Sequence, residues 1–347
     1  MNQALVAFIA APVLCAVLLF YFGRVARRVG LVDVPDVRKR HRQSVPLVGG
    51  LAIWASLIIL ALLSPASLGS YRILAFCLLI ILAIGLLDDL KEVSAHLRII
   101  VQIVVASILV YFGDAVVRSV GEVFFVEKPY GLGYAAIPFS IIAVVGTINA
   151  FNMIDGHDGL AGSMFVIPLA ALTVLSYFSG LTYWPLVLLI TVTLLPFLFF
   201  NLGFAGGNRK VFLGDAGSMS LGLLLVFLLI RFSHPEVGVL KVTSAPWLIA
   251  LPLLDMIGVM VFRVREGRSP FHSDRFHIHH LLLGLGWSEA RVLIVLVLTQ
   301  LSFTLIGVFG TVWHWNDGLL MWSCFLILAG YLKLLSLLRR QIALRSV

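Results

Sequence analysis

Eleven long apolar runs constrain the fold of this chain more than any other feature of its sequence. They lie near residues 4–22, 47–63, 71–87, 99–113, 136–151, 160–178, 183–200, 217–232, 246–262, 290–310 and 319–337. A helix of about 20 apolar residues crosses the roughly 30 Å hydrocarbon layer of a membrane. We therefore predict an all-α polytopic integral membrane protein with about eleven transmembrane helices. Because the run at 99–113 is short, ten or twelve spans stay open.

The composition excludes a soluble domain. The chain is 61% hydrophobic and 12% charged, whereas soluble domains are about 45–50% apolar and about 25% charged. Its three cysteines lie inside apolar runs without CxxC spacing, which indicates neither a disulfide framework nor a zinc cage. No small-residue cleavage site follows the first run, so we expect a retained span. No internal repeat is visible, and we treat residues 1–347 as a single transmembrane catalytic domain.

The basic residues predict an orientation. With eleven spans, 20 of the 25 Lys and Arg residues fall in one set of loops. Positive charge accumulates in cytoplasmic loops, so we expect the N-terminus outside and the C-terminus in the cytoplasm. The net charge of +8 is then a topology signal, and we expect no nucleic-acid partner. The cytoplasmic loops would be 23–46, 88–98, 152–159, 201–216 and 263–289, and residues 116–134 would form a small hairpin outside.

Two acidic clusters fall in these loops. Adjacent Asp88 and Asp89 end the third run; because two neighbouring carboxylates repel, they favour a cation beside them. Arg98 could return a positive charge to the same face. In the second cluster, Asn149, Asn152, Asp155 and Asp158 recur every three residues, so a helical backbone would place them on one face. Such a stripe suits a divalent cation or a nucleotide, although an Asx-rich turn also explains it.

A third cluster contains Asn201 and Arg209-Lys210, followed by Gly214-Asp215-Ala216-Gly217-Ser218. Asp215 or Ser218 could cap the helix that starts here. The same position, with a basic dipeptide upstream, is also where a phosphate and its metal could be held.

A fourth cluster is the basic segment from Arg263 to His280, which ends in His277-Ile278-His279-His280. Zinc is the first alternative, but the neighbours are arginines rather than Cys or Glu. Guanidinium and imidazole groups together favour an anion such as a pyrophosphate. Asp255, within the ninth run, is expected to be structural and to pair with a basic residue or with polar backbone. The run Arg38-Lys39-Arg40-His41-Arg42 is a topology signal that could also attract an anionic lipid headgroup.

Together the clusters predict phosphoryl transfer between a soluble nucleotide and a lipid, because acids that bind a cation and a basic loop that binds phosphate meet on one membrane face. A transporter is less favoured, since its polar groups would gather at the bilayer midplane. An intramembrane aspartyl protease is also disfavoured, because Asp215 is predicted on a loop.

The motifs resemble those of the polyprenyl-phosphate N-acetylhexosamine-1-phosphate transferases. The resemblance rests on four motifs in order between about residues 30 and 285: Asp88-Asp89, the Asn149 to Ala161 segment, Phe212 to Ser218, and Ser269-Pro270-Phe271 with its histidines. The chain is most similar to the bacterial branch that acts on undecaprenyl phosphate and GlcNAc. Members of the family often carry Lys at the position of His96.

The resemblance implies transfer of GlcNAc-1-phosphate from UDP-GlcNAc to undecaprenyl phosphate, release of UMP, and the start of O-antigen or related glycan synthesis at the bacterial inner membrane. It implies Mg²⁺ or Mn²⁺ as cofactor and an active site facing the cytoplasm. Another UDP-HexNAc donor and a homodimer stay open. Direct attack by the lipid phosphate is favoured over a two-step route through an Asp nucleophile.

It also implies roles for individual residues. Asp88 would deprotonate or orient the lipid phosphate with support from Asp89. Asp215 and Asn152 would bind the metal, and Arg40 and His41 the lipid phosphate. The nucleotide sugar would be bound by Asn149, Asp155, Asp158, Asn201, Arg98, Arg263, His277, His279 and His280.

Overall fold

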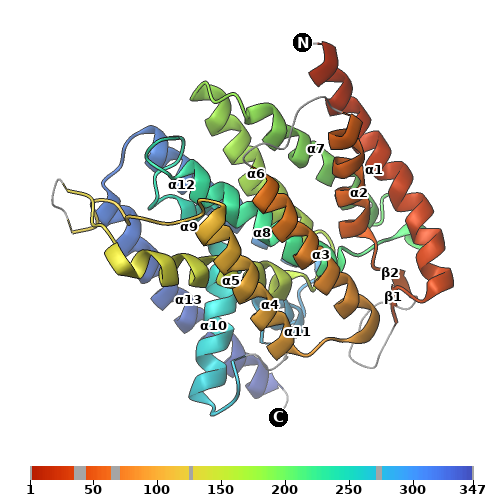
Figure 1. Cartoon of the computed structure of the whole chain (residues 1–347). Helices are drawn as coiled ribbons and strands as arrows, with labels where there is room; N and C mark the ends of the chain where they lie inside the picture. Colours follow the sequence, from red (N-terminus) through yellow and green to blue (C-terminus); the bar gives the residue numbers. More distant parts are fainter. Residues whose placement is uncertain (1, 35–43, 64–70, 125–127, 271–275, 346–347) are drawn as a thin grey trace.

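The computed structural model describes residues 2–34, 44–63, 71–124, 128–270 and 276–345. Within these ranges, nine helices are long and apolar enough to cross a membrane. They are α1 (Asn2–Val29), α3 (Arg72–Lys91), α4 (Ala95–Phe112), α5 (Ala136–Ile154), α6 (Leu160–Phe178), α7 (Trp184–Asn201), α8 (Gly214–Phe232), α12 (Glu289–Val312) and α13 (Asp317–Arg345). The prediction of an all-helical polytopic membrane protein is therefore confirmed (Figure 1).

The remaining two predicted spans are also helical but shorter. They correspond to α2 (Gly49–Leu63) and to α10 (Ala250–Arg265), which is preceded by the single turn α9 (Ala245–Leu248). The break between α9 and α10 falls at Ile249, whose φ of −130° and ψ of 27° are not helical. Eleven predicted positions thus contain helix, of which nine satisfy the length and composition of a span.

Helix α8 is the central element of the bundle (Figure 1). It packs against α2, α3 and α5, and nearly all of its residues are buried. Small residues allow the close approach: a Cβ added to Gly85 of α3 would lie 2.5 Å from the Ala216 Cα, and one on Gly222 would lie 3.1 Å from the Ile148 Cα. Close backbone contact between small residues is the usual way in which membrane helices pack.

A short extended segment fixes the start of α8. Strands β1 (Val32–Asp33) and β2 (Val45–Pro46) form an antiparallel pair, a feature that the all-α prediction did not include. Beyond β2, the Phe212 N–H donates to the Pro46 carbonyl at 2.9 Å, and Gly49 N–H donates back to the Phe212 carbonyl at 2.8 Å. The residues before α2 and before α8 are therefore hydrogen-bonded side by side.

The ends of several helices differ from the predicted loops. Helix α3 continues to Lys91, so Asp88 and Asp89 lie on its last turn rather than in a loop, because Leu86, Leu87 and Leu90 extend the apolar pattern. The predicted hairpin at 116–134 has antiparallel backbone bonds, among them Tyr130 N to Gly121 O at 2.8 Å and Leu132 N to Arg118 O at 2.9 Å. The short helices η2 (Gly133–Ala135), η3 (Gly207–Arg209) and α11 (Ile278–Gly284) complete the described elements.

Candidate active site

The adjacent carboxylates at the end of α3 have different partners. Asp88 is 7% exposed; its Oδ1 accepts the Val93 N–H at 2.7 Å, and the Arg98 guanidinium forms an ion pair with its Oδ2. The left-handed residue Glu92 (φ 50°) ends the helix and turns the chain so that Arg98, on the first turn of α4, returns to Asp88. The expected return of the Arg98 charge to this face is present.

Asp89 instead caps the N-terminus of α8. Its Oδ1 accepts the Asp215 N–H at 2.8 Å, and its Oδ2 accepts the Ala216 N–H at 3.1 Å. The first amides of a helix lack partners within the helix, and a carboxylate there also complements the helix dipole. Asp215 and Ser218 are the two possible caps that the sequence offers, and neither takes these amides, because Asp89 accepts both.

Asp215 lies beside the same arginine. Its Oδ2 is 3.6 Å from the Arg98 Nη1, so a single guanidinium faces carboxylates from α3 and α8. Asn152, near the end of α5, donates from its Nδ2 to the Asp215 Oδ1 at 2.6 Å and to the Ser218 Oγ at 3.0 Å. Four helices, α3, α4, α5 and α8, thus bring two carboxylates, one carboxamide and one guanidinium together.

The Asn/Asp stripe is helical in its first half only. Helix α5 ends at Ile154, and residues 155–159 form a turn that ends at Gly159 with φ 75°. Asp155 and Asp158 therefore do not share a helix face with Asn149 and Asn152, because the glycines end the helix. Asp158 forms an ion pair with Lys210. Burial, together with the charges of Asp89 and Asp158, raises the pKa of Asp155 to about 7.

Two carboxamides hold this turn and its helix in place. The Asn201 Oδ1 accepts the Gly159 N–H at 2.6 Å and its Nδ2 donates to the Val211 carbonyl at 2.9 Å, so Asn201 connects the turn to the segment before α8. Asn149 donates to the buried Gln102 Oε1 at 2.6 Å. Both carboxamides therefore form hydrogen bonds to other groups of the protein.

The histidine segment is anchored by Asp255. This 1% exposed carboxylate lies 2.7 Å from the His277 Nδ1, accepts the Ile278 N–H at 2.9 Å, and accepts the Tyr331 hydroxyl at 2.9 Å. The expectation of a structural Asp255 with polar backbone and basic partners is met, and those partners belong to the histidine segment. Arg263 is buried and donates from its Nη1 to the Pro270 carbonyl at 2.7 Å.

His279 joins this segment to the 155–159 turn. It is 1% exposed, and neither of its ring nitrogens has a hydrogen-bond partner in the described part of the chain. A Cβ on Gly156 would lie 2.8 Å from the His279 Nε2, so a side chain at position 156 would displace this imidazole. Burial and the neighbouring His280 hold the pKa of His279 well below its usual range. A neutral imidazole therefore faces the turn that carries Asp155.

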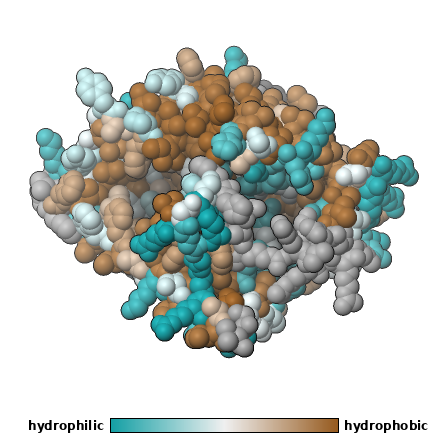
Figure 2. Space-filling model, turned by 90° about the horizontal axis from the view of Figure 1, so that it is seen from below, coloured by the Kyte–Doolittle hydropathy of each residue, from teal (hydrophilic) through white to brown (hydrophobic). Residues whose placement is uncertain are grey.

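These contacts form one polar region at one end of the bundle. Seen from below, this end of the molecule exposes many hydrophilic side chains among hydrophobic ones (Figure 2). Arg40 and His41 lie outside the described residues. His280 is partly exposed on α11.

The donor set fits Mg²⁺ or Mn²⁺ better than zinc. The described residues contain no group of three or more His, Cys, Asp or Glu side chains that could hold a metal ion by themselves. Asp88 and Asp215 nevertheless offer carboxylate oxygens beside Arg98, and Asn152 offers a carboxamide beside Asp215. Mg²⁺ is commonly bound through one or two protein carboxylates, with water and substrate phosphate completing its coordination shell. The carboxylates of Asp88 and Asp215 match that requirement.

Two further residues of the site, Gln102 and Tyr331, were not singled out from the sequence, and Ser218 was considered only as a helix cap. Gln102 and Ser218 hold the carboxamides of α5, and Tyr331 holds Asp255. Gln102 has a sequence signal, since it is the one amide side chain in the apolar run 99–113. Tyr331 has none, because its partner lies 76 positions away.

The chain is similar to known proteins over most of its length. The model of the family described as "Glycosyl transferase family 4" matches residues 71–233. The chain is 35% identical to a protein of Yersinia pestis, over 84% of this chain and 80% of that protein. It is 33% identical to one of Escherichia coli O157:H7, over 89% and 84% respectively. A protein of Haemophilus influenzae is 32% identical over 86% and 84%. All three are named undecaprenyl-phosphate alpha-N-acetylglucosaminyl 1-phosphate transferase.

Proposed function

Because this chain belongs to glycosyl transferase family 4, we propose that it transfers GlcNAc-1-phosphate from UDP-GlcNAc to undecaprenyl phosphate and releases UMP. The observation that carries the proposal is the position of Arg98 between the carboxylates of Asp88 and Asp215. Phosphoryl transfer depends mainly on positioning and on neutralising charge. A site with paired carboxylates, a guanidinium and a neighbouring histidine segment provides both.

In the proposed reaction, an oxygen of the lipid phosphate attacks the sugar-bearing phosphorus of UDP-GlcNAc. The new P–O bond forms as the bond to the bridging oxygen breaks, and UMP leaves with that electron pair. Asp88 orients the lipid phosphate, and Asp89 keeps the α8 N-terminus in place beside it. When bound, Mg²⁺ or Mn²⁺ neutralises phosphate charge, and Asp215 and Asn152 are the residues that would hold it.

The nucleotide sugar would lie between the 155–159 turn and the histidine segment. Asp155 and Asp158 would contact the nucleoside, and Arg98, His279 and His280 the pyrophosphate, with Arg40 and His41 binding the lipid phosphate. Asn149, Asn201, Arg263 and His277 would act by positioning, since each hydrogen-bonds to other protein groups. The site would face the cytoplasm of a bacterial inner membrane, where the product starts a lipid-linked surface glycan such as O-antigen.

The experiment is an assay of the purified protein with undecaprenyl phosphate and a panel of UDP-HexNAc donors, in which UMP is measured. We expect turnover with UDP-GlcNAc to exceed that with UDP-GalNAc and other donors. If another donor gives the faster turnover, the proposed donor is wrong but the reaction type stands. If no donor yields UMP, the proposed reaction itself is wrong. A phospho-sugar adduct trapped on Asp88 would replace direct attack by the two-step route.

A further inference from the structure

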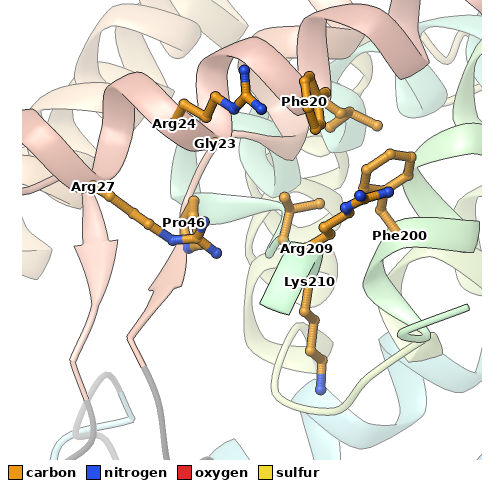
Figure 3. Close-up of a pocket in the computed structure, with 10 residues that line it drawn as sticks. Phe20, Gly23, Arg24, Arg27, Pro46, Phe200, Arg209 and Lys210 are labelled. Atoms are coloured by element: carbon orange, nitrogen blue, oxygen red, sulfur yellow. The ribbon is translucent and has the colours of Figure 1, made fainter. Parts of the chain in front are cut away.

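A basic hollow lies between α1 and the segment that follows α7, apart from the acidic site. Its volume is about 190 Å³. Arg24 and Arg27, one helical turn apart on α1, face it from one side, and Arg209 faces it from the other, with Phe20 and Phe200 beside them (Figure 3). The hollow therefore has a cationic mouth and apolar, aromatic walls.

The arginines of the hollow are held in place by neighbours. The Arg24 Cζ lies 4.0 Å from the centroid of the Phe20 ring, and the Arg209 Cζ lies 5.7 Å from the same centroid. Arg27 donates from its Nη2 to the Asn208 carbonyl at 2.5 Å. Two arginines therefore share one ring, and the third connects α1 to the segment that carries Arg209. Such contacts lower the conformational freedom lost when an anion binds.

Among the residues that the structure describes, these positive charges lack an acidic partner. Lys210, at the edge of the hollow, turns away from the arginines (Figure 3) and forms an ion pair with Asp158. Over the described ranges, no ion pair with Asp or Glu is formed by Arg24, Arg27 or Arg209. Like charges in a small space repel, and a bound anion would relieve that repulsion.

We propose that this hollow binds the phosphate headgroup of an anionic membrane phospholipid. Its volume of about 190 Å³ is below the roughly 300–1,000 Å³ of pockets that enclose drug-sized ligands, so it suits a headgroup and not a nucleotide sugar. The flanking surfaces are apolar and exposed, with Val17 and Tyr21 on α1 and Leu195 and Phe199 on α7. Acyl chains can lie along these surfaces while the phosphate meets the guanidinium groups.

The bound headgroup has a structural consequence for the acidic site. Arg209 and Lys210 are adjacent, and Lys210 pairs with Asp158 of the 155–159 turn. A phosphate held by Arg209 and the α1 arginines therefore fixes the segment from which Lys210 reaches that turn. The binding itself does not depend on the proposed reaction, and it is measured without turnover.

The test measures lipid binding to the full chain purified in neutral detergent. Phosphatidylglycerol, phosphatidylcholine, undecaprenyl phosphate and inorganic phosphate are titrated separately, and adducts are counted by native mass spectrometry while the melting temperature is followed.

Two variants alter the hollow, and each has a matched control. Gly23→Leu fills the hollow, because the nearest atoms to a Cβ at Gly23 belong to Pro46 and Val211 and lie 4.0 Å away, which leaves room for a side chain. Its control is Gly330→Leu, where a Cβ meets nothing within 4 Å. Arg24→Gln/Arg27→Gln removes charge from the hollow, and its control is Arg28→Gln on the same exposed helix end.

We expect phosphatidylglycerol to bind and to raise the melting temperature of the wild type and of both controls, and phosphatidylcholine to do neither. The Gly23→Leu and double Arg variants should lose the shift, with binding weakened roughly fivefold for each arginine removed. If Gly23→Leu does not fold, the double variant alone decides. Equal binding by all variants would contradict the proposal. A larger rise in melting temperature with undecaprenyl phosphate than with phosphatidylglycerol would contradict the proposal and assign the hollow to the acceptor lipid. A rise with inorganic phosphate would also contradict it, because the hollow would then be a site for free phosphate.

Discussion

The carboxylate of Asp89 accepts the backbone N–H of Asp215 at 2.8 Å. Asp89, at the end of α3, thereby caps α8, the helix that carries Asp215. Its neighbour Asp88 points instead to Arg98. Adjacent acids thus have separate partners: Asp88 pairs with Arg98, and Asp89 fixes the position of Asp215 relative to Asp88.

Replacing Asp89 should affect stability in a graded way. Asp89→Ala leaves the Asp215 and Ala216 amides without their acceptor, and loss of a helix cap costs about 0.5–2 kcal/mol. Asp89→Asn keeps one acceptor oxygen and should lose less. Thermal unfolding of the two variants measures the order, with Lys91→Ala on the same turn as control. An Asp89→Ala protein that melts with the wild type would contradict the capping role.

Tyr331 should influence nucleotide-sugar binding although it lies in the middle of α13 and outside the sequence motifs. Tyr331→Phe removes the hydroxyl that donates to Asp255, and a hydrogen bond to a charged group contributes about 1.5–3 kcal/mol. Because Asp255 also orients His277, we expect a higher KM for UDP-GlcNAc and an unchanged KM for undecaprenyl phosphate. The exposed Tyr177→Phe is the control. Equal effects on both KM values would indicate general loosening instead.

The stability of the metal-free protein should depend on Asp155 and on pH. The pKa of Asp155 is raised to about 7 by burial and by Asp89 and Asp158, so the folded state holds a proton that the unfolded state releases near pH 4. Stability is therefore lost as the pH rises through that window toward 7. Asp155→Asn cannot ionise, and in EDTA it should raise the melting temperature more at pH 8 than at pH 5. The same change at both pH values would exclude this ionisation as the cause.

Sequence reasoning located the helices and the clusters because each is a local pattern. The apolar runs gave the spans, and the polar interruptions gave Asp88, Asn152, Asp215 and the histidines. The partners could not be found in this way. Asp89 and Asp215 lie 126 positions apart, and Tyr331 and Asp255 lie 76 apart, and no periodicity within one segment encodes such pairs.

Local backbone conformation was the second feature that could not be predicted from the sequence. The three-residue spacing from Asn149 to Asp158 is helical in pattern, yet α5 ends at Ile154 because the glycine-rich turn favours other conformations. Likewise, the pattern at Gly214 to Ser218 is typical of a self-capped helix, but Asp89 supplies the cap. The local glycines decided the first case, and a contact from another segment, the Asp89 carboxylate, decided the second.

The most direct test of the account is the dependence of UMP release on Mg²⁺ concentration in the wild type and in Asp215→Asn, with undecaprenyl phosphate and UDP-GlcNAc as substrates and the exposed Glu236→Gln as control. The account predicts that the wild type and the control require the cation, and that Asp215→Asn loses turnover by roughly 10²–10³-fold or more, as when a charge-stabilising group is removed from an active site. An Asp215→Asn protein with wild-type turnover and the same Mg²⁺ dependence would contradict it.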